Sequence, residues 1–251
     1  MNLIYGCLSE QGIHRKKNQD ALFFDTRRVF QNEICAAVVC DGVGGFPDSE
    51  FASGRTVSLI GQWFARCMQE YAGDGAENRK KGRSLKSVCY VYDEMKNGLL
   101  ECLWSAHKSV SEEAAERKFK AATTVCAMLA AGGFYSIYST GDSRIYKIGA
   151  GMKQMTTDQV VERNGKKVLS NCLGSFPGPD FQRIEGRIQK KKTYLIATDG
   201  FYKKVDAAAA VKHFGKAQTS EEMIAALTGF REYAVGMGEK DDSTGIALKF
   251  L

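Results

Sequence analysis

The chain has 251 residues, of which 44% are hydrophobic, and its 35 Lys and Arg against 29 Asp and Glu give a net charge of +6. No Pro- or Ser-rich linker and no internal repeat divides this length, so we expect one domain over residues 1–251. The basic residues lie in short runs without interleaved aromatic residues, which argues against nucleic-acid binding, although a mildly basic surface suits an anionic substrate. No apolar run approaches the length of a membrane span, so no membrane attachment is expected.

The cysteines and the N-terminal segment indicate the compartment. None of the eight cysteines forms a CxxC pair, and most lie in apolar runs, where a free thiol packs as a small hydrophobic group. The segment MNLIYGCLSEQG has no apolar core of the signal-peptide kind. We therefore expect a reduced, cytoplasmic protein, and a monomer.

The first half of the chain predicts strands followed by a pair of helices. Strand-type runs occur at 3–9, 21–25 and 33–40, and helical stretches follow at 49–71 and 84–108. In the first helix, apolar residues recur at steps of three and four: Val57, Ile60, Phe64, Cys67, Met68 and Tyr71. The polar, glycine-rich joint GDGAENRKKGR is typical of the exposed tip of a helical hairpin.

The second half repeats this order. Strand-type runs lie at 123–130, 134–140, 144–149, 193–198 and 244–250. The Ala-Gly-Gly at 131–133 predicts a hairpin turn, and hence antiparallel pairing. Helices fit 206–214 and 220–235, and Ser220 or Thr219 can cap the second of these. Strands and helix pairs in alternation predict an α+β fold with segregated layers rather than a βαβ repeat.

Five aspartates fall at the ends of expected strands, and one of them interrupts the run VVCDGVGG. They are Asp20, Asp41, Asp142, Asp199 and Asp241. A single Asp-Gly is usually only a turn, but five carboxylates at the same kind of position indicate one acidic cluster at a shared sheet edge. Like charges a few ångströms apart repel strongly, so a divalent ion is the natural neutraliser. An all-oxygen ligand set favours Mg²⁺ or Mn²⁺ over Zn²⁺, and the three histidines form no ligand pattern.

Such a cluster suits phosphoryl transfer. Two hard ions can clamp an in-line phosphoryl displacement and activate a bridging water. Arg15, five residues before Asp20, could fork onto the oxygens of a phosphate. The alternative is that Arg15 is a solvated charge within the basic run HRKK.

A family resemblance rests on eight short pieces in one order. They are RKKNQDA, VVCDGVGG, TTVCAML, GDSRIY, TDQ, LSNCLGS, ATDGFY and DDST. In this order they resemble the metal-dependent Ser/Thr protein phosphatases of the PPM (type 2C) family, from about residue 6 to 250, and the bacterial stand-alone form most of all. The resemblance implies a sandwich of two antiparallel β-sheets flanked by pairs of α-helices. It also implies a signalling enzyme that hydrolyses phosphoserine and phosphothreonine in the protein substrates of a kinase.

The resemblance also implies roles for individual residues. The implied metal ligands are Asp20, Asp41, Gly42, Asp199 and Asp241, with Asp142 at a looser third ion found in some members. Asp41 would bridge two Mn²⁺ or Mg²⁺ ions, and Gly42 would lend its backbone carbonyl to one of them. Asp199 and Asp241 would complete the shell of the second ion, Asp20 would bind directly or through a water, and Arg15 would hold the substrate phosphate.

Several positions depart from the family pattern. Val43 stands where many eukaryotic members have a histidine, thought to be a general acid. Gln159 replaces the histidine of TDH, SNCLG replaces the commoner TRALG, and Asp242 stands where Asn is usual. We therefore expect an atypical flap over 156–180, and substrate choice is the property that this affects.

Rival functions differ in the sequence motifs that they require. An inactive relative that acts as a regulatory binding module is one alternative, but every expected metal carboxylate is present. A regulatory interaction protein that uses the helical hairpin 49–108 as its contact surface is compatible with enzymatic activity. A phosphatase for small phosphorylated molecules remains open, whereas a HAD-like hydrolase would need a DxDxT motif. A nucleotide-binding module would need GxxxxGK[ST], which does not occur.

Overall fold

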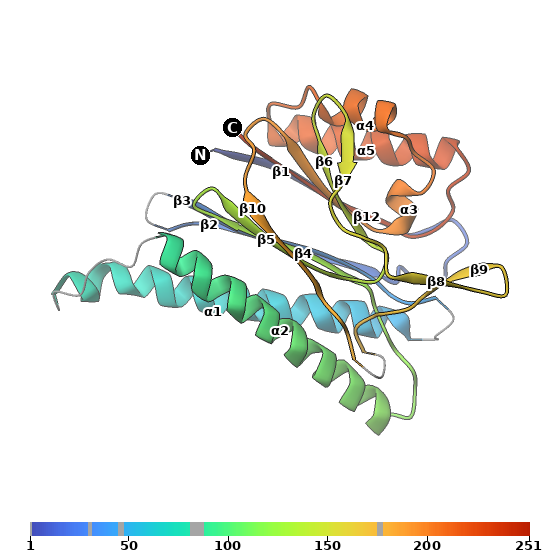
Figure 1. Cartoon of the computed structure of the whole chain (residues 1–251), viewed down its shortest axis with the longest axis horizontal. Helices are drawn as coiled ribbons and strands as arrows, with labels where there is room; N and C mark the ends of the chain where they lie inside the picture. Colours follow the sequence, from blue (N-terminus) through green and yellow to red (C-terminus); the bar gives the residue numbers. More distant parts are fainter. Residues whose placement is uncertain (1, 30–31, 45–47, 81–87, 175–177) are drawn as a thin grey trace.

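The structure is a computed structural model that describes residues 2–29, 32–44, 48–80, 88–174 and 178–251. Its elements form four layers: two antiparallel sheets lie face to face, one helix pair covers the outer face of each, and both termini lie at one end (Figure 1). This is the predicted α+β sandwich. Within the described ranges no helix combines the length and the apolar character needed to cross a membrane.

The first sheet contains the strands that carry Asp20 and Asp41. Its order is β10 (Gln182–Arg187), β5 (Phe134–Thr140), β4 (Val125–Ala131), β3 (Asn32–Asp41) and β2 (Asp20–Val29). Every pairing in it is antiparallel, and the turn between β4 and β5 is the predicted one, with Gly132 and Gly133 at φ values of 60° and 86°. Glycine suits both positions because other residues rarely adopt positive φ.

The second sheet contains the strands that lie next to the other three aspartates in the sequence. Its order is β1 (Leu3–Glu10), β12 (Ser243–Phe250), β11 (Thr193–Ala197), β6 (Arg144–Ile148) and β7 (Met152–Gln154). A separate hairpin of β8 (Val160–Arg163) and β9 (Lys166–Leu169) projects from the sandwich on the side where α3 (Asp199–Tyr202) lies (Figure 1). Within the second sheet, the first strand of the chain, β1, pairs with the last, β12.

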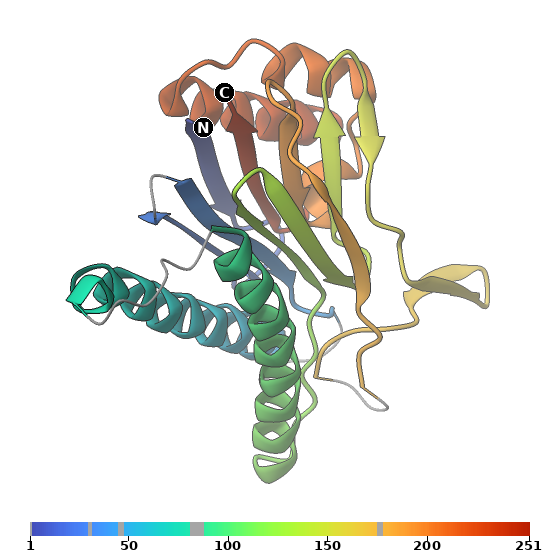
Figure 2. The ribbon, with the colours of Figure 1, turned by 60° about the vertical axis from the view of Figure 1, so that its left-hand side comes forward.

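Each helix pair buries an apolar face against its own sheet. Helices α1 (Ser49–Lys80) and α2 (Val88–Glu116) cover the first sheet and splay apart as they leave it (Figure 2). Helices α4 (Ala207–Phe214) and α5 (Ser220–Gly236) cover the second sheet. Of the two expected caps of α5, Thr219 accepts the N–H of Glu222, whereas the Ser220 hydroxyl accepts the N–H of Tyr5.

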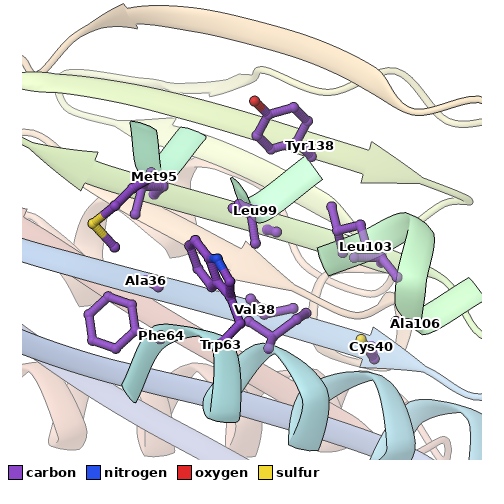
Figure 3. Close-up of a cluster of buried hydrophobic side chains, with 14 of the residues drawn as sticks. Ala36, Val38, Cys40, Trp63, Phe64, Met95, Leu99, Leu103, Ala106 and Tyr138 are labelled. Atoms are coloured by element: carbon purple, nitrogen blue, oxygen red, sulfur yellow. The ribbon is translucent and has the colours of Figure 1, made fainter. Parts of the chain in front are cut away.

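The core between the first sheet and its helices is well filled. Trp63 and Phe64 of α1 and Leu99 of α2 point toward the small residues Ala36 and Val38 of β3 (Figure 3). Alternate residues of β3 face the other way and pack between the two sheets, so the strand is buried on both faces. That position explains why β3 reads as a continuous apolar run until Asp41 ends it.

The helix boundaries differ from those expected. Helix α1 continues to Lys80, through much of the joint assigned to a hairpin tip, while residues 81–87 lie outside the described ranges. Helix α2 runs eight residues past the expected end at 108, because Val110 and Ala114 extend its buried face. Strands β7 to β10 and helix α3 were not expected as separate elements.

Candidate active site

The sheet registers bring the five aspartates to one end of the sandwich. Asp20 and Asp41 are direct partners in the β2–β3 ladder. Asp199 follows β11 and Asp241 precedes β12, its antiparallel neighbour, so both lie at the same edge. Asp142 precedes β6, which pairs with the other side of β11. Residues as distant as 20 and 199 in the sequence act on each other because the two sheets that carry them lie face to face.

The charges of these side chains act on one another. Burial raises the pKa of Asp41 well above its ordinary value, and the carboxylates of Asp20, Asp199, Asp142 and Asp241 raise it further. Burial also raises the pKa of Asp20 to about 7, opposed by hydrogen bonds from threonine hydroxyls, and that of Asp142 to about 6. Ionised carboxylates at this edge are therefore costly unless a cation neutralises them.

Two basic side chains neutralise two of the carboxylates. Arg15 donates its Nε–H to Asp241 Oδ1 at 2.8 Å, and its Nη2 lies 2.6 Å from the same oxygen. Lys203 Nζ lies 2.7 Å from Asp199 Oδ2. Among the described residues, no three Asp, Glu, His or Cys side chains are arranged to surround one ion. The five aspartates thus lie at one end of the sandwich, whereas the side chains of Asp199 and Asp241 each contact a basic partner.

Two neighbouring threonines hold the backbone of Asp41. The Thr124 hydroxyl accepts the Asp41 N–H at 3.0 Å, and the Thr124 N–H donates to the Asp41 carbonyl at 2.8 Å. The Thr123 hydroxyl donates to the same carbonyl at 2.9 Å. Thr124 also shares a hydrogen bond of 2.6 Å with Ser143, next to Asp142. The motif TTVCAML therefore ties two of the acidic turns together.

Glycine is required after Asp41 and after Asp199, because neighbouring backbone lies too close to leave room for a side chain. A Cβ on Gly42 would lie 2.7 Å from the carbonyl oxygen of Ser49, and one on Gly200 would lie 2.1 Å from that of Asp242. Real Cβ atoms do not approach backbone oxygens this closely, so larger residues would push the chain segments apart. Each Asp-Gly pair is thus a packing point as well as a turn.

Asp242 holds the loop that carries Arg15. Its Oδ1 accepts the N–H of Gly12 and its Oδ2 accepts the N–H of Gln19, both at 2.8 Å, and the residue is 4% exposed. A carboxylate accepts at both oxygens, whereas an asparagine at the same place would turn its NH₂ toward one N–H. The departure from the usual Asn is therefore a structural adaptation of this chain.

We expect Asp242→Asn to lower the free energy of unfolding by about 1–3 kcal/mol, because one buried N–H loses a charged acceptor. Urea denaturation followed by circular dichroism measures this. Asp206→Asn is the matched control: Asp206 caps α4 by accepting the Ala209 N–H, and asparagine caps about as well. Equal stability of the two variants would contradict the role of Asp242.

Val43 and Gln159 are two further departures, and the Gln159 side chain has a structural role. The Val43 N–H donates to the Ala122 carbonyl at 2.9 Å, and this apolar side chain has no proton to donate to a leaving group. Gln159 joins the acidic turn to the flap: its Oε1 accepts the Gly141 N–H at 3.0 Å and its Nε2 donates to the Asp180 carbonyl at 2.9 Å. Residues 175–177 of the flap lie outside the described ranges.

Several residues at this edge were not expected from the sequence. Thr198 donates its hydroxyl to Asp20 Oδ2 at 2.8 Å, and Glu239 accepts the backbone N–H of Asp241 at 3.1 Å. Lys203, the partner of Asp199, was also missed. Its spacing of four residues after an aspartate on a helix was the available signal.

Comparison with known proteins identifies the family. The model of the family described as protein phosphatase 2C matches residues 13–228, which is most of the chain. The chain belongs to the protein phosphatase 2C family. This confirms the resemblance stated from the motifs, and the enzymes of this family and the solved neighbours are Ser/Thr protein phosphatases. The chain matches no curated protein sequence.

Solved bacterial members of this kind share the fold at low sequence identity. The S. agalactiae serine/threonine phosphatase is 15% identical, with a TM-score of 0.75 and 100% of both chains covered. Stp1 from Staphylococcus aureus is 18% identical, with a TM-score of 0.75 over 100% of this chain and 96% of its own. The catalytic domain of PstP, solved in complex with two manganese ions, is 16% identical, with a TM-score of 0.73 over 98% and 97% of the two chains. At these identities the likeness concerns the fold.

Proposed function

We propose that the protein removes phosphate from phosphoserine and phosphothreonine in proteins and that it depends on two Mn²⁺ or Mg²⁺ ions. The observation that carries the proposal is the acidic edge at which Asp20, Asp41, Asp142, Asp199 and Asp241 interact through their charges. The donors are all oxygen, as hard divalent ions prefer. When bound, such ions supply polarisation of a water and of the phosphoryl oxygens.

The ligand set that we assign is Asp41, Gly42, Asp199 and Asp241, with Asp20 direct or through a water. What supports it is the donor chemistry together with the cost of ionising these groups without a cation, because the pKa of Asp20 is raised to about 7 and that of Asp41 well beyond its ordinary value. Asp241 is bound to Arg15, which a divalent ion would displace, while Asp199 contacts Lys203 through Oδ2, which leaves Oδ1 for an ion. The site is thus acidic enough to attract cations.

Arg15 orients the substrate in this proposal. Its guanidinium directs both Nε and Nη2 at one carboxylate oxygen of Asp241. The same planar fork fits two oxygens of a phosphate monoester. Gln19 accepts a third N–H of Arg15, from Nη1, at 3.0 Å and so limits how far the side chain turns. Arg15 can therefore exchange Asp241 for a phosphate without leaving the site.

The alternative function is a regulatory binding module without catalysis. The observation that favours it is the pairing of Asp199 and Asp241 with Lys203 and Arg15, since two cations already neutralise part of the cluster. Such a module would not need hydrolysis, and it would not need metal to keep its fold. Measuring metal binding and turnover separately distinguishes the two functions.

The test is hydrolysis of p-nitrophenyl phosphate and of a phosphothreonine peptide by protein stripped with EDTA and then titrated with Mn²⁺ or Mg²⁺. We expect no turnover in EDTA, recovery with either ion, and resistance to okadaic-acid-type inhibitors. Asp241→Asn should weaken metal binding and turnover together, while Asp206→Asn, remote from the cluster, should match wild type. Full activity in metal-free buffer would rule out the proposed chemistry, and metal binding without turnover would favour the binding module.

A further inference from the structure

Lys203 stands at the end of the one-turn helix that Asp199 begins. The Lys203 N–H donates to the Asp199 carbonyl at 2.9 Å, and its ammonium group returns along the same face to Asp199 Oδ2 at 2.7 Å. The carboxylate is 17% exposed and the lysine side chain 60% exposed. Residues four apart on a helix lie on one face, so the backbone itself presents the ammonium to the carboxylate.

The same ammonium acts on Asp142. Tyr202, next to Lys203, donates its hydroxyl to the Asp142 carbonyl at 2.7 Å, and the Arg144 guanidinium lies 4.0 Å from the centre of the Tyr202 ring. These contacts fix the turn that carries Asp142 against α3. Burial and the charge of Asp199 raise the pKa of Asp142, and Lys203 opposes that rise. Asp142 and Asp199 are therefore close enough to repel, and Lys203 attracts both.

The next lysine in the chain provides a comparison. Lys204 is exposed and forms no ion pair or hydrogen bond within the described residues. Two adjacent lysines of identical chemistry thus differ in one respect, which is contact with the acidic edge. If basic residues were only favoured in general at this helix end, Lys203 and Lys204 would be expected to behave alike.

We propose that the Lys203 ammonium group is the permanent counter-cation of Asp142 and Asp199 and takes the place of a third divalent ion, so that the protein binds two ions and not three. This inference rests on the proposed function. Asp142, which the family resemblance links to a looser third ion, then has its charge opposed by a side chain of the protein itself.

Competition between the ammonium and an ion favours the ammonium at this place. Two carboxylates completed by water make a weak site for Mg²⁺ or Mn²⁺. A divalent ion there would have to displace a cation that the helix holds beside Asp199, or else bind next to it against a like charge. The two principal ions have more carboxylates, so the contact of Lys203 with one oxygen of Asp199 weakens their binding less.

The test counts bound Mn²⁺ by the electron paramagnetic resonance signal of the free ion and by calorimetry, on the folded full-length chain. We expect two ions in wild type and three in Lys203→Met, whose third site should tighten by at least roughly tenfold on loss of the like charge. Lys203→Arg keeps the positive charge and should bind two. Lys204→Met is the matched control and should also bind two.

A double variant locates the additional ion. Adding Asp142→Asn to Lys203→Met should return the count to two, and thermal melting of each variant checks that it is folded. Three ions in wild type, or two in a folded Lys203→Met, would overturn the inference and leave the proposed two-ion enzyme intact. If wild type bound no Mn²⁺ at all, the proposed function and this inference would both fail.

Discussion

Asp41→Asn should abolish phosphatase activity and, in the absence of metal, make the protein more stable. The loss of turnover is expected because Asp41 is the carboxylate on which the charges of the four other aspartates act, and we assign it to bridge both ions. A fall in kcat of at least about 10³-fold is expected for a ligand shared by both ions. The Mn²⁺ affinity should fall with it.

The gain in stability follows from the raised pKa of Asp41. An aspartate with a raised pKa binds its proton more tightly in the folded state than in the unfolded state, so folding stability is lost as the pH rises through the folded pKa. At neutral pH, which lies above the pKa of an aspartate in the unfolded chain, the raised pKa in the folded state is therefore a cost that Asn removes. For a chain of this size each kcal/mol relieved raises Tm by about 2–4 °C.

Circular dichroism melting in EDTA measures this effect. Asp25→Asn on β2 is the control, because Asp25 lies outside the acidic edge and pairs with Arg27 at 3.0 Å. That variant should keep both activity and wild-type Mn²⁺ affinity. A lower Tm for metal-free Asp41→Asn than for wild type would show that the Asp41 carboxylate supports the fold, contrary to this account.

The strands and the acidic edge were predictable because burial leaves a strong signal in sequence. Strands such as β3 and β11 are buried on both faces, so their apolar runs stop abruptly where the chain meets solvent at Asp41 and near Asp199. An antiparallel sheet returns each chain segment to the same edge. Five aspartates at strand ends could therefore be assigned to one cluster without coordinates.

Other features leave a weak signal or none. Strands β8 and β9 are mostly exposed, so no apolar pattern marks them, and α3 has only four residues, too few for helical periodicity. Helix α1 continues into a polar, glycine-containing stretch that composition assigns to a turn. The pairing of Arg15 with Asp241 joins residues 226 positions apart, and only the three-dimensional structure determines which of the basic residues near the cluster reach it.

Arg15→Ala should separate substrate binding from metal binding. Loss of the fork that positions the phosphate should lower kcat/KM by roughly 30- to 1000-fold, equivalent to about 2–4 kcal/mol of transition-state stabilisation. Because Arg15 also neutralises Asp241, the same change frees that carboxylate, and Mn²⁺ affinity should rise. A ligand variant such as Asp241→Asn has the opposite effect on affinity, since it removes an oxygen donor from the ion.

Steady-state kinetics over a Mn²⁺ titration checks both effects in one experiment. Arg15→Lys keeps the charge but cannot form the planar fork, so it should restore wild-type Mn²⁺ affinity and recover only part of kcat/KM. Arg28→Ala is the control, because Arg28 is an exposed arginine that pairs with Glu33 at 2.9 Å, outside the acidic edge. If Arg15→Ala equals wild type in kcat/KM at saturating Mn²⁺, Arg15 does not bind the phosphate, and its role is confined to holding Asp241.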